Sequence, residues 1–301
     1  MKLEMALNVD EITIFLLPTG LGTMANVSVF VNQICTFVSS RKKSIHLILI
    51  HLAFTNIIML LLKGTQITIA ALGLKHFLGD LGCLIIFYLR RVARGLSICT
   101  SGLLTVVQAI IISPRASWWG SLKLRSPEYV LLSLLFFWIL NSVISMNILH
   151  SIRNRGTNTL QLSINDRYCY FRKESQKINN IFLMLMVLRD AVFQGAMGGA
   201  SGYMVFLLHK HHQHVLYLQN SKFLYRTPPE LRAAQSVLLL MLCFLFFYWT
   251  DCFVSLHLSF SWKNDSLTMN FQEFLTIGYA VLSPWILIHR DGHLAKCWCA
   301  R

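Results

Sequence analysis

The chain has 301 residues, of which 55% are hydrophobic and only 13% are charged. Soluble domains carry about 25% charged residues, so this composition, with a mean hydropathy of +0.55, is that of a polytopic membrane protein. The net charge of +14 does not indicate a nucleic-acid partner, because the basic residues are scattered between apolar segments and form no continuous stripe.

Seven apolar segments are long enough to cross a bilayer, which takes roughly 20 residues. They cover residues 12–38, 45–72, 81–113, 128–149, 178–208, 232–257 and 270–289. The third and fifth are interrupted by charged residues, and the seventh is amphipathic. The remaining residues form short connections, so we expect an all-α bundle of seven transmembrane helices in a single domain, 1–301. The basic cluster Arg41-Lys42-Lys43 after the first segment favours an N-terminus outside and a C-terminus inside. The outer surface of the bundle would contact membrane lipids.

The third segment carries three arginines within its first half. A guanidinium stays charged, so in hydrocarbon it must face water, an acid or a ligand. On a helix, Arg90 and Arg94 share a face that Ser97 continues, whereas Arg91 points about 100° away. Two interpretations stay open: the charges pair within the bundle and hold it together, or they contact a ligand.

The acidic residues of the later segments are the candidate partners for these arginines. Asp190 lies beside Arg189 in the fifth segment, Asp251 lies in the sixth, and Glu273 lies at the outer start of the seventh. Any of them could offset a cation within the membrane.

Two cysteines fall on the predicted outer face, Cys83 at the start of the third segment and Cys169 in the loop before the fifth. A disulfide between them would persist on the oxidising side and tether the loop to the bundle; two free thiols are the alternative. Cys297 and Cys299 follow the last segment on the inner side, where palmitoylation and an unmodified tail are both open.

The run His209-Lys210-His211-His212-Gln213-His214 ends the fifth segment on the inner side. A solvated helix end explains it, and a contact surface for an intracellular partner is the functional alternative. We expect no metal site, because no carboxylate or thiolate converges on these imidazoles. In the same segment, Gly195, Gly198, Gly199 and Gly202 indicate close packing within the bundle, with dimerisation as the alternative.

Other motifs are few. Asn264 begins a glycosylation sequon in a short outer loop, where we expect poor use because the acceptor is close to the membrane. The chain has no GxSxG, HExxH or P-loop motif, and no inverted repeat. We therefore expect neither an enzyme nor a cofactor.

Several blocks of the sequence resemble the type 1 vomeronasal (pheromone) receptors, a family of G-protein-coupled receptors. The blocks are His51-Leu52-Ala53, Gly73-Leu74-Lys75-His76-Phe77-Leu78, Arg91-Val92-Ala93-Arg94-Gly95-Leu96-Ser97, Gln108-Ala109-Ile110, His209-Lys210-His211-His212-Gln213, Phe247-Tyr248-Trp249 and Ser283-Pro284-Trp285-Ile286-Leu287-Ile288-His289. They are spread over nearly the whole chain. Like that family, the chain lacks the Asp-Arg-Tyr of rhodopsin-like receptors, with Val107-Gln108-Ala109 in its place; it departs from the family at Ser44, where a proline is common, and in lacking a sequon in the second outer loop.

The resemblance implies a plasma-membrane pheromone receptor that activates an inhibitory-class heterotrimeric G protein. A small volatile or steroid-like ligand would bind between helices three, five, six and seven, in the outer half of the bundle. The ligand contacts would come from Arg90, Arg94, Asp190, Asp251 and Glu273, and the G-protein contacts from Arg115, Lys210, His211 and His212. Since Arg94 belongs to the family block and Arg90 does not, Arg90 is the better candidate for ligand selectivity. The alternative function is a small transporter or channel that uses the arginines as an anion path; the oligomeric state stays open.

Overall fold

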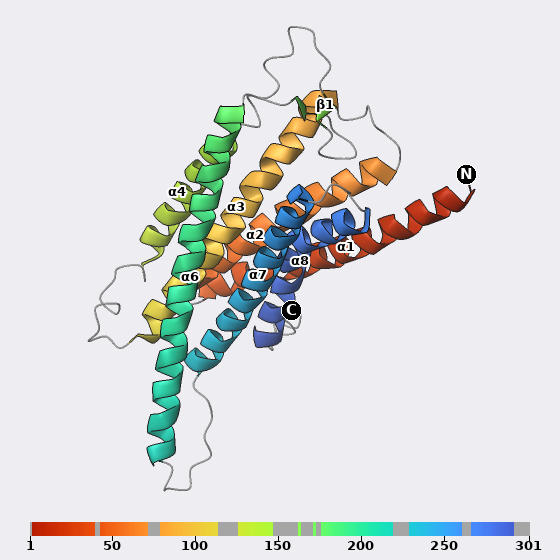
Figure 1. The fold of residues 1–301 in the computed structure, drawn as a ribbon. Helices are drawn as coiled ribbons and strands as arrows, with labels where there is room; N and C mark the ends of the chain where they lie inside the picture. Colours follow the sequence, from red (N-terminus) through yellow and green to blue (C-terminus); the bar gives the residue numbers. More distant parts are fainter. Residues whose placement is uncertain are drawn as a thin grey trace.

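The computed structural model describes residues 2–39, 43–71, 79–113, 126–146, 162–163, 171–172, 176–218, 229–260 and 266–291. Its elements in chain order are α1 (Lys2–Ser39), α2 (Lys43–Ala71), α3 (Gly79–Ile112), α4 (Pro127–Ser145), β1 (Leu162–Ser163), β2 (Phe171–Arg172), α6 (Gln176–Leu218), α7 (Pro229–Phe260) and α8 (Ser266–Asp291). The seven helices of this described part confirm the predicted all-α bundle (Figure 1).

Five of these helices contain a stretch that is long and apolar enough to cross a membrane, where the sequence predicts seven. The five stretches are Ile14–Val38, Ser44–Ile69, Leu84–Ile112, Pro127–Ser145 and Met184–Lys210. The described apolar stretches of α7 and α8 are shorter, Val237–Asp251 and Phe274–Ile288. Both helices as a whole are nevertheless longer, at 32 and 26 residues.

Local sequence explains where α4 begins and how polar residues are tolerated inside the helices. Pro127 occupies the first turn of α4, where its missing N–H costs nothing, and Glu128 in the same turn suits the helix dipole. Within the helices, hydroxyl groups such as those of Thr19, Thr65 and Thr105 donate to the carbonyl four residues earlier, at 2.7–2.8 Å. These bonds satisfy hydroxyl groups that have no water to bond within an apolar span.

Helix α3 is the axis of the bundle. It packs against α2, α4, α6 and α7, and the contacts of α8 with both α1 and α7 close the ring around it. In an apolar window of 18 residues, 83% of the residues of α3 are buried, against 22% in the corresponding window of α6. Charged side chains on α3 therefore face protein, and their partners must come from the surrounding helices.

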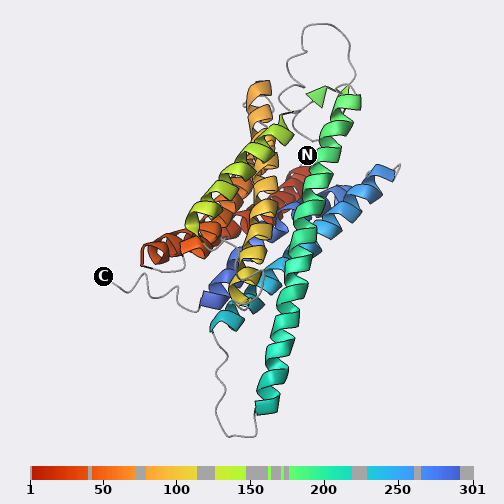
Figure 2. The same cartoon turned by 90° about the vertical axis from the view of Figure 1, so that its left-hand side faces the viewer.

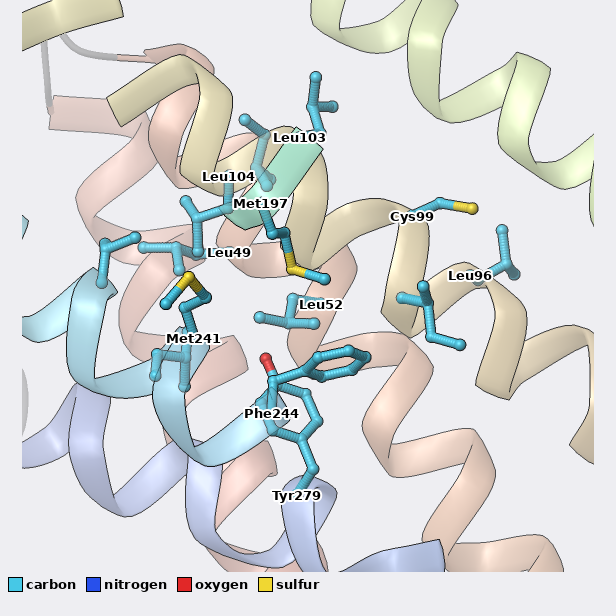
Figure 3. Packing of buried hydrophobic residues seen from close by; sticks show 14 of the residues in the cluster. Leu49, Leu52, Leu96, Cys99, Leu103, Leu104, Met197, Met241, Phe244 and Tyr279 are labelled. Atoms are coloured by element: carbon cyan, nitrogen blue, oxygen red, sulfur yellow. The ribbon is translucent and has the colours of Figure 1, made fainter. Parts of the chain in front are cut away.

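The hydrophobic core lies along α3 and draws on all six of the other described helices. Figure 3 shows Leu96 and Leu104 of α3 among side chains from α2, α6, α7 and α8, including Leu52 and Phe244. Phe244 meets the ring of Tyr279 edge to face, with 4.7 Å between the ring centroids. This packing fixes the relative position of α3, α7 and α8.

Helix α6 runs past the ends of the other helices (Figures 1 and 2). It continues to Leu218, so the histidine run lies within the helix. Its four glycines do not pack against the bundle: Gly195, Gly198, Gly199 and Gly202 are exposed, and a Cβ added at any of them would meet nothing within 4 Å. The interpretation of these glycines as packing positions within the bundle is therefore wrong.

A short antiparallel hairpin precedes α6. Leu162 of β1 pairs with Arg172 of β2, and Ser163 pairs with Phe171. In both views the hairpin lies at the same end of the bundle as the first turns of α3 and α6 (Figures 1 and 2). The opposite end is marked by a hydrogen bond of 2.9 Å between the hydroxyls of Ser113, just after α3, and Tyr203 of α6.

Candidate functional site

An ion pair lies roughly halfway along α3. The Arg94 guanidinium donates from Nη2 to Oδ2 of Asp251 on α7, at 2.5 Å. The Asp251 side chain is nearly buried, at 6% exposure, whereas that of Arg94 is 37% exposed. Thr276 of α8 also donates to the carboxylate, at 3.3 Å from its Oδ1. One acidic residue thus connects α3, α7 and α8.

A second ion pair lies on α6. Arg189 contacts Oδ1 of its neighbour Asp190 with both Nε and Nη2, at 2.7 and 2.5 Å. Its Nη1 donates to Oδ1 of Asn141 on α4, at 2.7 Å. The side chains of this pair are 5% and 13% exposed, so both charges are held away from solvent. Paired charges of this kind are the form in which ionised groups persist inside a membrane protein.

Tyr248 of α7 connects the two ion pairs. Its hydroxyl donates to Oδ2 of Asp190 at 2.9 Å. The Arg94 guanidinium carbon lies 6.0 Å from the centroid of the same ring, within the range of a cation–π contact. A displacement of Tyr248 would therefore alter the contacts of both ion pairs.

A pocket opens beside the Arg94–Asp251 pair, with an empty volume of about 380 Å³ that includes its opening to solvent. The pocket is lined by Met59 of α2, Arg94, Ser97 and Ile98 of α3, Phe244, Phe247, Tyr248 and Asp251 of α7, and Leu275, Thr276 and Tyr279 of α8. The mixture of aromatic walls and a few converging polar groups is typical of a ligand site.

The other two arginines of α3 have different surroundings. Arg90 donates to Oε1 of Gln66 on α2 at 2.8 Å, and its guanidinium lies 5.2 Å from the centre of the Phe87 ring. It is not among the residues that line the pocket. Arg91 donates from Nε to the sulfur of Met186 on α6, at 2.8 Å. Of the three arginines, Arg94 alone lines this pocket.

The remaining predicted site residues are described less fully or not at all. Lys210 is exposed near the end of α6. Cys83, Glu273, His211 and His212 belong to described helices, but their side chains lie outside the described part. The residues for which nothing is described are Arg115, Cys169, Asn264, Cys297 and Cys299.

A buried polar cluster that the sequence analysis did not single out adjoins the pocket at Ser97. Asn56 of α2 donates to Asn26 of α1 at 3.4 Å and to Ser283 of α8 at 3.1 Å, and it accepts from Ser97 of α3 at 3.1 Å. Asn26 donates in turn to the Ala280 carbonyl, at 2.8 Å. The signal in the sequence was present, because amides are rare within apolar spans and need partners there.

His51 forms a third polar connection. Trp138 of α4 donates to His51 Nε2 at 2.9 Å, and His51 Nδ1 lies 3.0 Å from the Thr100 hydroxyl. An indole N–H can only donate, so Nε2 accepts and the hydrogen of the neutral ring is on Nδ1, facing Thr100. This single tautomer joins α2, α3 and α4.

Gly95 of α3 faces the second ion pair. A Cβ at this position would overlap Oδ1 of Asn141 and Nη1 of Arg189, the two atoms that are hydrogen-bonded to each other. Gly95 is thus required for the contact between α3, α4 and α6, which gives a physical reason for a glycine next to Arg94.

The sequence profile of the vomeronasal organ pheromone receptor family matches residues 10–300. The chain belongs to this family. Human vomeronasal type-1 receptor 4 is 33% identical over 277 residues, which cover 91% of each chain. Human vomeronasal type-1 receptor 3 is 34% identical over 86% of this chain and 84% of its own length.

The fold agrees with this assignment. The crystal structure of squid rhodopsin matches 97% of this vomeronasal receptor chain and 84% of the rhodopsin chain with a TM-score of 0.72, at 16% identity. The chain is therefore a pheromone-type G-protein-coupled receptor with a multi-pass helical fold, and such a receptor has a ligand and a G protein as partners.

Proposed function

We propose that the receptor binds a small chemosignal in the pocket between α3, α7 and α8 and activates an inhibitory-class heterotrimeric G protein at the plasma membrane. The observation that carries this proposal is the position of the pocket against the Arg94–Asp251 pair. A ligand there touches α3, α7 and α8 at once. It can therefore favour one arrangement of these helices over another, which is the thermodynamic requirement for a ligand-driven change of state.

The G protein would bind at the end of the bundle where α3 finishes. The Ser113–Tyr203 hydrogen bond brings the last turn of α3 close to α6, and α6 extends beyond it with Lys210 exposed. Arg115, His211 and His212 follow these positions in the sequence and are proposed to belong to the same basic surface. This end would face the cytoplasm, and the N-terminus would lie outside.

The proposal is tested in cells that express the full chain with a tag at each end. We expect the N-terminal tag to be labelled on intact cells and the C-terminal tag only after permeabilisation. Fractions of vomeronasal chemosignals that activate the receptor should lower forskolin-stimulated cAMP. Solute flux in response to the same fractions, without any change in cAMP, would instead favour the transporter or channel.

Substitution within the pocket links the response to the site. Ser97→Phe should abolish the cAMP response per receptor at the cell surface, because the larger side chain fills the space beside Arg94. Surface expression is measured in parallel, because Ser97 also donates a hydrogen bond to Asn56. Ser133→Phe, at a half-buried position of α4 outside the pocket, is the matched control. A full response of the Ser97→Phe receptor would contradict the location of the ligand.

A further inference from the structure

We propose that this pocket selects uncharged ligands that carry a hydrogen-bond-accepting oxygen, and that Arg94 binds that oxygen. The inference rests on the proposed function in one respect, that a ligand occupies the pocket. It goes further in naming the chemistry of the ligand and the residue that recognises it.

The first argument is electrostatic. Among the described lining residues, Arg94 and Asp251 carry the formal charges, and they are bonded to each other. The pocket is therefore neutral as a whole. A carboxylate or sulfate that approached Arg94 would also approach Asp251, and an ammonium would meet the opposite problem. A charged ligand would lose its hydration without gaining an unpaired counter-charge, which is unfavourable away from water.

The second argument concerns hydrogen-bond donors. A guanidinium has five N–H groups, and one Nη2–H of Arg94 is used by Asp251. Its remaining N–H groups have no hydrogen-bond partner among the described residues, and the side chain is partly exposed beside the pocket. They are available to an oxygen lone pair. Since Asp251 already offsets the charge, a neutral carbonyl or ether oxygen is sufficient.

The hydroxyl groups of the pocket do not compete for this role. Ser97 donates its hydrogen to Asn56, and Tyr248 donates its own to Asp190. The Thr276 hydroxyl faces the Gln272 carbonyl at 2.9 Å and the Asp251 carboxylate at 3.3 Å. The Tyr279 hydroxyl is hydrogen-bonded to the Ser101 hydroxyl, at 2.8 Å. Each of these hydroxyl groups is thus hydrogen-bonded within the protein, so Arg94 is the donor with capacity to spare.

The other lining residues determine that the remainder of the ligand is apolar. Met59, Ile98, Phe244, Phe247 and Leu275 present carbon surface to the pocket. Burial of apolar surface against them supplies the binding free energy, and the single contact with Arg94 supplies orientation.

The inference is tested by direct binding of one ring skeleton with different substituents. The full-length receptor in lipid nanodiscs is titrated with cyclododecanone, cyclododecane, cyclododecanecarboxylate and cyclododecylammonium, and the Kd values are compared. We expect the ketone to bind at least about tenfold more tightly than each of the other three. A charged compound that binds as tightly as the ketone would overturn the proposal, and so would equal binding, or no binding, of ketone and hydrocarbon.

Two variants assign the roles of the pair. Asp251→Asn removes the internal counter-ion, so the carboxylate should gain about tenfold or more relative to the ketone. Glu128→Gln makes the same change of carboxylate to amide at an exposed position on α4 and should leave the ranking unaltered. Arg94→Gln should remove the preference for ketone over hydrocarbon. An unaltered ranking in folded Asp251→Asn or Arg94→Gln receptor would contradict the assigned role, and the unmodified receptor decides the ligand class even if neither variant folds.

The proposed ligand class and the proposed receptor function can be contradicted separately. Ketone binding without any cAMP response in cells would contradict the proposed function and leave the ligand class standing. A cAMP response to a carboxylate through this pocket, with none to neutral compounds, would contradict the ligand class and leave the receptor function standing.

Discussion

Gly95 shows how a single missing side chain can permit a hydrogen bond between two neighbouring helices. It stands where α3 approaches α4 and α6, and the Arg189–Asn141 hydrogen bond occupies the space that a Cβ would take. The residue follows Arg94 directly, so the backbone that carries one charge also makes room for another, the buried guanidinium of Arg189.

Gly95→Ala should lower the stability of the receptor by about 1–3 kcal/mol, the usual cost of forcing a methyl group into a packed site. The measurement is thermal unfolding of the purified protein in detergent. Gly198→Ala is the control, since an added Cβ there meets nothing within 4 Å; it should be neutral or raise stability by up to about 1 kcal/mol through helix propensity. Equal stability of the two variants would argue against the close approach at Gly95.

Arg94→Ala should weaken the agonist response more than Arg91→Ala. Removing Arg94 leaves the nearly buried Asp251 without its cation, whereas removing Arg91 costs a contact with the Met186 sulfur. Dose–response curves for cAMP, normalised to surface expression, measure the difference. If both substitutions shift the curve to the same extent, both arginines act through the bundle alone.

Helical spacing predicts the direction of these arginines but not their partners. It correctly separates Arg91 from Arg90 and Arg94, and Asp251 was among the acids expected to pair. Asp190 instead meets Arg189 and Tyr248, and Arg90 meets Gln66. Which side chains pair between two helices depends on how the helices are rotated and shifted relative to each other. The sequence of a single helix does not determine that arrangement.

At the scale of the element, the helices differ in what holds them together. Apolar packing surrounds α3, while Asn56 gives α2 polar contacts with α1, α3 and α8. The existence of the helices follows from hydropathy, because a span must be apolar along its length. The end of α6 at Leu218 does not follow, because the polar run His209–His214 interrupts the apolar signal before the last turn of the helix.

Asn56→Leu should destabilise the receptor by about 1–2 kcal/mol, given about 0.6 kcal/mol for a hydrogen bond between membrane helices. The same change at Asn32 of α1, whose side chain makes no described hydrogen bond, is the control. Thermal unfolding compares the two variants. A larger loss in Asn32→Leu would contradict the structural role of the cluster around Asn56.

On the scale of the whole molecule, the arrangement of helices reproduces a known receptor fold at low sequence identity. The sequence blocks that resemble the vomeronasal receptor family correctly predict this arrangement. The pocket was less predictable, since its walls come from four helices whose contacts are set only in the assembled bundle. The tether between Cys83 and Cys169 stays a prediction, supported by the hairpin that lies at the same end as the start of α3.

Cys83→Ser and Cys169→Ser should each reduce delivery to the cell surface, because either change removes the proposed disulfide. Flow cytometry of an N-terminal tag on intact cells measures it. Cys35→Ser, at an exposed position within α1, should have little effect. Normal surface levels and a normal response in both Cys83→Ser and Cys169→Ser would remove the tether from this account.

The difference in burial between α3 and α6 makes the bundle mechanically unequal. A shift of α3 would disturb neighbours on every side, whereas α6 packs mainly against α3 and meets α4 and α7 at few points, among them the Arg189–Asn141 and Asp190–Tyr248 hydrogen bonds. Helix α6 also extends past the ends of the other helices, so a small rotation about its packed middle would move its far end by a larger distance. The work that a ligand must supply to move α6 is therefore set by its apolar packing on α3 together with these polar contacts.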